Sequence, residues 1–217
     1  MMSVFPEELL SHLEKRGVVA GFSVKNIEHA VPLAQALLAG GIDIIELTLR
    51  TPIGLDAVKL IADEVPEMVV GVGTILTPET AVAVKEAGAH FGVAPGMNPR
   101  VVKAAQEAGL PFAPGICTPS DLEAAIELGC RFVKFFPAEA AGGLTYLKSM
   151  AAPYDHLGIR YFPLGGVNSE NMLDYLAEDF VPTVGGTWIV AKDFVQNEDW
   201  AEITAAAQEV VNTIKRS

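Results

Sequence analysis

The sequence has little that would suit nucleic acid, a membrane or a disulfide-stapled fold. Its 27 acidic residues outnumber 15 basic ones, and the net charge of −12 counts against nucleic acid, which requires a basic surface. Half of the residues are hydrophobic, yet no apolar run approaches the roughly 18 residues of a membrane helix. Two cysteines, Cys117 and Cys130, are too few for a disulfide scaffold. We therefore expect free thiols and neither a nucleic-acid nor a membrane partner.

The sequence also lacks the pattern of a secretory signal peptide and the pattern of a metal site. Glu7 and Glu8 stand near the N-terminus, where a secretory signal would have basic and then apolar residues, so we expect a cytoplasmic protein. The histidines are scattered, and none has a metal-ligand spacing to Asp, Glu or Cys. We expect no metal ion and no cofactor. The four positions are His12, His29, His90 and His156.

What the sequence does contain is an alternation of short β-branched runs with Ala/Leu/Glu-rich stretches of helical periodicity. Such alternation, with strands that are apolar throughout, favours a parallel sheet covered by helices. Eight runs are found, at 18–19, 42–49, 69–72, 91–93, 111–113, 132–136, 161–162 and 183–184.

Helix boundaries are marked by residue type. Thr77, Asn98 and Thr118 each precede a proline and are suited to cap a helix start, and Ala-Gly or Leu-Gly pairs mark the helix ends. No linker or composition change divides the chain. We therefore expect one domain, residues 1–217, folded as a closed (β/α)8 TIM barrel with an extra N-terminal helix at 7–16 and a C-terminal helix at 198–215. An open, doubly wound sheet is the alternative.

The second predicted strand carries charge on one face. In a strand, side chains alternate between faces, so Glu46, Thr48 and Arg50 share one face, and Leu47 and Leu49 share the other. If the polar face points into the barrel, Glu46 lies where a proton-transferring carboxylate would act. The structural alternative is an internal ion pair between Glu46 and Arg50.

Lys134 lies in an aromatic strand, Phe-Val-Lys-Phe-Phe-Pro. Burial favours the neutral amine, which is the nucleophile that forms a Schiff base with a carbonyl compound. Such chemistry needs a nearby proton shuttle, for which Glu46 is the candidate. Alternatively, Lys134 extends from the strand end toward water or pairs with Glu46 for structural reasons.

Two glycine pairs follow the last two predicted strands, at Gly165-Gly166 and Gly185-Gly186. In barrels, the loops after strands 7 and 8 commonly bind phosphate, because glycine lets backbone N–H groups approach an anion. The acidic chain would need such local positive groups to hold an anionic substrate.

The stretches 41–50 and 129–142 resemble the two signatures of the 2-keto-3-deoxy-6-phosphogluconate / 4-hydroxy-2-oxoglutarate aldolase family. The resemblance covers nearly the whole chain in order. It continues through 72–74, 94–96, 114–116, 163–166 and 185–188.

This resemblance implies a metal-independent lyase that cleaves such substrates to pyruvate and an aldehyde, with Lys134 as the Schiff-base lysine and Glu46 as the general acid/base. It further implies a homotrimer. It assigns the pyruvate carboxylate to Arg50 and Thr74, the pocket walls to Pro95 and Phe136, and the aldehyde and phosphate end to Leu164, Gly165, Gly166, Gly185, Gly186 and Thr187.

Two positions depart from the family pattern. The first strand reads Ala20-Gly21-Phe22, where members usually have Pro or Ala and two aliphatic residues, and Leu164 replaces a frequent threonine. These changes concern the aldehyde half of the substrate. The alternatives are therefore an aldolase of different stereopreference, a sugar-phosphate isomerase on a similar barrel, and a barrel that binds phosphosugars without turnover.

Overall fold

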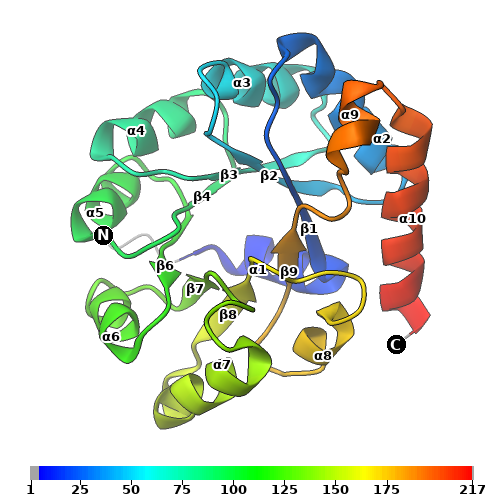
Figure 1. Ribbon diagram of the computed structural model, residues 1–217. Coiled ribbons are helices and arrows are strands. Elements are labelled where there is room, and N and C mark those ends of the chain that lie inside the picture. Colours follow the sequence, from blue (N-terminus) through cyan, green and yellow to red (C-terminus); the bar gives the residue numbers. More distant parts are fainter. Residues whose placement is uncertain (1–4, 217) are drawn as a thin grey trace.

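Parallel strands form the centre of the molecule, and helices surround them (Figure 1). The computed structural model describes residues 5–216. One sheet has the order β5-β4-β3-β2-β1-β9, and a second has the order β6-β7-β8. The strands are β1 (Val18–Phe22), β2 (Ile44–Thr48), β3 (Val69–Gly73), β4 (Phe91–Val93), β5 (Phe112–Ala113), β6 (Gly115–Ile116), β7 (Phe132–Phe135), β8 (Arg160–Pro163) and β9 (Val184–Gly186).

All eight predicted runs contain strand structure, and a further short strand, β6, follows the fifth run outside its predicted bounds. β5 and β6 flank Pro114, which has no N–H to donate. β5 pairs with β4, whereas β6 pairs with β7. A single bridge between Leu164 and Gly185 connects the end of β8 with β9. The α/β fold with a curled parallel sheet is thus confirmed, but the hydrogen-bonded ladders form two sheets and not one continuous eight-stranded barrel.

The helices begin and end largely where the sequence indicates. Thr77, Asn98 and Thr118 each accept a hydrogen bond from a backbone N–H of the helix that follows. The helices are α1 (Glu7–Arg16), α2 (Ala30–Ala39), α3 (Gly54–Glu64), α4 (Pro78–Glu86), α5 (Pro99–Glu107), α6 (Pro119–Glu127), α7 (Gly143–Ala151), α8 (Met172–Leu176), α9 (Lys192–Gln196) and α10 (Trp200–Arg216), with short 3₁₀ turns at Ile27–His29 and Ala152–Leu157. Among residues 5–216, no helix is both long and apolar enough to cross a membrane.

The buried apolar side chains form two groups, one on each side of the strands. Ile45 and Leu47 of β2 belong to the large group that includes buried residues of the surrounding helices. Ile44 belongs to the smaller group inside the curled sheet, together with Leu13 of α1. Since strand side chains alternate, Glu46 and Thr48 face the interior, as the sequence predicts. Helix α1 therefore packs on the interior group near the amino ends of the strands.

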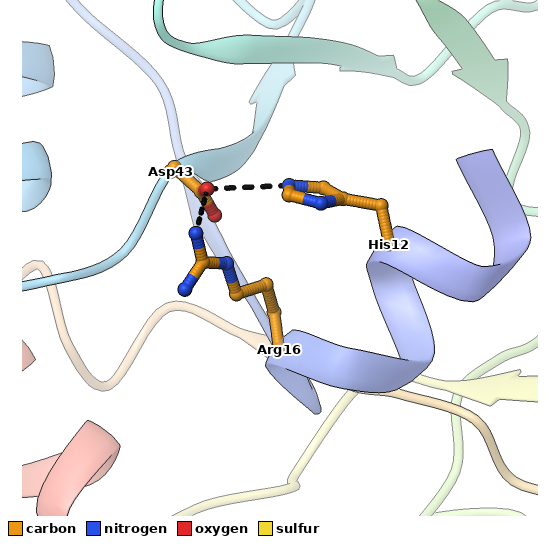
Figure 2. A network of polar contacts seen from close by, with 3 residues as sticks. All are labelled: His12, Arg16 and Asp43. Carbon is orange, nitrogen blue, oxygen red and sulfur yellow. Dashed lines mark hydrogen bonds and ion pairs between the residues drawn. The ribbon is translucent and has the colours of Figure 1, made fainter. Parts of the chain in front are cut away.

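An ion pair also connects α1 with the start of β2. The Arg16 guanidinium lies 2.5 Å from the Asp43 carboxylate, and His12 Nε2 lies 3.2 Å from the same oxygen (Figure 2). Asp43 immediately precedes β2, so these contacts lie at its amino end. They hold α1 against the sheet.

Candidate active site

Lys134 and Glu46 meet in the interior of the curled sheet. Lys134 Nζ donates a hydrogen bond of 2.8 Å to Glu46 Oε1, although 88 residues separate them in the sequence. Only 6% of Lys134 and 1% of Glu46 is exposed, so water cannot replace either partner. A lysine and a carboxylate this close can exchange a proton directly. The structure thus brings together the two residues that the sequence singles out as catalytic.

Glycines of β3 make room for the Glu46 side chain. Gly71 and Gly73 pair with Glu46 and Thr48 of β2, respectively. A Cβ atom on Gly73 would overlap the Glu46 carboxylate, and one on Gly71 would overlap the ring of Phe91. No role for Gly73 is predicted from the sequence motifs. The signal was available, because Gly71 and Gly73 alternate in Val-Val-Gly-Val-Gly and leave the carboxyl half of one strand face without side chains.

Phe136 and Pro95 lie beside the lysine. The Phe136 ring centroid is 5.3 Å from Lys134 Nζ, within the range of a cation–π contact. Gly115 pairs with Lys134, and a Cβ atom on Gly115 would overlap the backbone of Pro95. Phe136 therefore lies beside the Lys134 amine, and the Pro95 backbone lies against Gly115, the residue paired with Lys134 on the neighbouring strand.

Arg50 and Thr74 follow the carboxyl ends of β2 and β3. Arg50 is exposed and Thr74 is half-buried. The backbone of Thr74 has φ of 66°, a conformation that is rare and strained for a β-branched residue. Leu49 N donates a hydrogen bond to Gly73 O, which holds the two strand ends together. Both residues thus lie at the carboxyl-terminal edge of the sheet, just beyond the ends of β2 and β3.

The two glycine loops are adjacent in space. Gly165 and Gly166 both have positive φ, near 92° and 93°, and follow the buried Leu164, whose bridge to Gly185 connects the two loops. Gly165 O accepts a hydrogen bond from Glu139 N. The remaining members of the predicted phosphate end, Gly186 and Thr187, come next in the chain, and Thr187 is exposed.

A hollow lies elsewhere on the molecule, beside α7 and α8. It has a volume of about 650 Å³, is lined by residues of α7 and α8 and contains neither Lys134 nor Glu46. Tyr175 in its wall donates a hydrogen bond of 2.5 Å to Glu139, and burial together with this bond raises the tyrosine pKa. Its own lysine–carboxylate pair, Lys148 and Glu178, has side chains that are 53% and 21% exposed, so we take the buried pair of Lys134 and Glu46 as the candidate active site.

The fold and this pair define a class of protein: an α/β enzyme with a buried lysine–carboxylate pair inside a curled parallel sheet, ready to act on a carbonyl compound. The sequence model of the KDPG and KHG aldolase family matches residues 9–206. The chain therefore belongs to this family, whose names stand for 2-keto-3-deoxy-6-phosphogluconate and 4-hydroxy-2-oxoglutarate. It is an aldolase, which is a carbon–carbon lyase.

Relatives and solved structures agree with the family. The KHG/KDPG aldolase of Escherichia coli K12 is 44% identical over 198 residues, which are 91% of this chain and 92% of the relative. A KDPG aldolase from Legionella pneumophila, solved with pyruvate captured at low pH as a covalent carbinolamine, has a TM-score of 0.88 and 36% identity, covering 93% of this chain and 97% of its own. The Zymomonas mobilis ZM4 aldolase with 3-phosphoglycerate has a TM-score of 0.86 and 37% identity, covering 94% of each chain.

Proposed function

We propose that this aldolase cleaves 2-keto-3-deoxy-6-phosphogluconate to pyruvate and glyceraldehyde 3-phosphate, and 4-hydroxy-2-oxoglutarate to pyruvate and glyoxylate, through a Schiff base on Lys134. One observation carries the proposal: the buried Lys134 amine lies 2.8 Å from the Glu46 carboxylate. The carbinolamine of the Legionella relative supports covalent chemistry with pyruvate.

Proton transfer between the pair would start the reaction. Glu46 takes a proton from the Lys134 ammonium, and the free amine adds to the C2 carbonyl of the substrate. The resulting carbinolamine loses water when Glu46 returns the proton to its hydroxyl group. The product is an iminium ion, which can accept the electron pair released in the next step.

Cleavage follows from the same geometry. Glu46 removes the proton of the C4 hydroxyl, the C3–C4 bond breaks, and its electron pair moves into the iminium to form an enamine. The aldehyde departs. Protonation of the enamine at C3 and addition of water then release pyruvate and regenerate the Lys134 amine.

Charge and backbone donors would hold the two ends of the substrate. Arg50, with the neighbouring Thr74, is placed for the pyruvate carboxylate, since guanidinium binds carboxylate through two parallel hydrogen bonds. The two glycine loops and Thr187 are placed for the phosphate. Their closely spaced glycines leave backbone N–H groups free of side-chain cover, as an anion site requires.

We further propose that residues 1–217 act as one closed (β/α)8 barrel domain, and that the enzyme is a cytoplasmic homotrimer. The split strand around Pro114 and the Leu164–Gly185 bridge support closure, because they join the edges of the two sheets. The trimer rests on the family resemblance. We expect sedimentation equilibrium of the full chain to give a mass near three times 23.0 kDa.

Covalent trapping tests the central claim. Borohydride reduction with pyruvate present should add one pyruvate-derived mass to the peptide that contains Lys134, as read by mass spectrometry. The Lys134→Ala variant should show no added mass, and Lys148→Ala, which removes an exposed lysine of α7, should be labelled normally. Labelling at another residue, or none in the natural enzyme, would contradict the proposed function.

A further inference from the structure

The first strand differs from its neighbours on its interior side. Phe22 and Val24 pack in the outer apolar group, and Val19 packs in the interior group. By the alternation of strand side chains, Gly21 and Ser23 face the interior beyond Val19, toward the carboxyl end of β1. One contributes no side chain there, and the other contributes a hydroxyl group.

Gly21 lies between the acid/base and the phosphate end. It pairs with Glu46 of β2 on one side. On the other side, a Cβ atom on Gly21 would lie 3.3 Å from Gly186 O and 3.7 Å from Thr187 Cγ2. Because position 21 is glycine, no side chain of β1 enters the space between Glu46 and Thr187 at this level.

Ser23 directly follows the last residue of β1, two positions beyond Gly21, and is exposed. The backbone on both sides of it is held by β2 and the residues after it. Thr48 Oγ1 donates a hydrogen bond of 3.2 Å to Phe22 O, and Thr51 Oγ1 donates one of 2.8 Å to Val24 O. The backbone that carries Ser23 is therefore held on both sides, at the carboxyl end of β1.

The path of the bound substrate determines which of its carbon atoms lies next to Gly21 and Ser23. Its C2 carbon is bound to Lys134, its C4 hydroxyl is the group that Glu46 deprotonates, and its phosphate lies at the glycine loops with Thr187. The C5 carbon must therefore pass between Glu46 and Thr187, along Gly21. Leu164, next to the glycine loop, is buried and offers no polar atom to a hydroxyl group.

We propose that Gly21 and Ser23 form the subsite for the C5 hydroxyl of the six-carbon phosphorylated substrate, with Ser23 as a specificity-determining residue. The inference rests on the proposed function, since it presumes the same substrate path. Gly21 provides the space for the hydroxyl-bearing carbon, and Ser23 provides its hydrogen-bond partner. The shorter 4-hydroxy-2-oxoglutarate has a carboxylate at C5 in place of the hydroxyl-bearing carbon, so the subsite is proposed for the phosphorylated substrate alone.

The test uses the condensation direction with two aldehydes that differ in one group. Pyruvate is combined with D-glyceraldehyde 3-phosphate, whose C2 hydroxyl becomes the C5 hydroxyl, or with 3-oxopropyl phosphate, which lacks it. The ratio of kcat/KM for the two aldehydes should fall about fivefold in Ser23→Ala, the usual scale for one lost hydrogen bond. Ser23→Thr should retain the ratio, and so should Ser11→Ala, an exposed serine of α1.

A second variant tests the space. Gly21→Val should lower kcat/KM for both phosphorylated aldehydes by about tenfold or more, because displacement of the bound chain misaligns the reacting atoms. Trapping of pyruvate on Lys134 should persist. An unchanged ratio in Ser23→Ala, or full activity of Gly21→Val, would overturn the subsite. Failure of pyruvate trapping in the natural enzyme would instead overturn the proposed function.

Discussion

The start and the middle of strand β2 each have a buried or half-buried acidic residue, and the two residues have opposite surroundings. Asp43, just before the strand, contacts Arg16 and His12 of helix α1, and the Asp43 side chain retains 13% exposure (Figure 2). Glu46, inside the strand, contacts Lys134 and retains 2% side-chain exposure. One pair joins a helix to the sheet, and the other joins two strands across the interior.

The difference shows how position along a strand separates stability from chemistry. At the amino end, Arg16 is 40% exposed, so water can solvate the partners when the pair opens. In the interior, neither Lys134 nor Glu46 can be solvated, and a proton moved between them changes the reactivity of the amine. Removal of one interior partner would leave the other buried and unpaired, so a replacement that keeps the hydrogen bond, such as Glu46→Gln, is the one expected to lose activity and retain the fold.

The largest effect is expected for Glu46→Gln. The amide preserves the shape and can still contact Lys134 but cannot move protons, so kcat should fall by about 10² to 10⁴. Urea unfolding should show that the variant remains folded. Steady-state kinetics that match the natural enzyme would mean that Glu46 is only a structural partner of Lys134.

Gly73→Ala should have a smaller effect of the same kind. The new methyl group would overlap the Glu46 carboxylate, which lies at the end of a flexible side chain and can move aside. We expect kcat to fall by about tenfold or more, because a displaced catalytic group loses its alignment. The circular dichroism spectrum should be unchanged. As a matched control, Gly109→Ala on the surface should not alter kcat, although its φ of 69° should reduce stability.

Asp43→Asn should have the opposite effect, a loss of stability without a loss of kcat. Loss of the carboxylate weakens its contacts with Arg16 and His12, and the free energy of unfolding should fall by about 1 kcal/mol, because the pair is partly exposed. The value of kcat should remain that of the natural enzyme. Urea titration and kinetics on one preparation measure both, and a large loss of kcat would show that the two positions are not independent.

Chelation should have the smallest effect. The mechanism assigned to Lys134 and Glu46 requires no metal ion, so extensive treatment with EDTA should leave turnover essentially unchanged. Activity that disappears and returns on addition of zinc or magnesium would indicate a metal-assisted reaction instead.

The alternation of strands and helices could be read from the sequence, because helix caps and apolar periodicity are local signals. Thr118 illustrates this, since its side chain caps α6 as expected from the Thr-Pro pair that begins it. The division of the segment 112–116 around Pro114 was not foreseen. It depends on β4 and β7 pairing with different halves of the segment, which local sequence does not encode.

The sequence by itself determined which residues could react. A lysine among aromatic residues and a glutamate on the polar face of an otherwise apolar strand are unusual wherever they fold, because burial of a charge is costly without a partner. Only the tertiary structure decided that they are each other's partner at 2.8 Å, and that Gly73 leaves room for the Glu46 carboxylate. Contacts between residues 88 positions apart depend on the register of strands and the curl of the sheet, which arise from the packing of the whole chain.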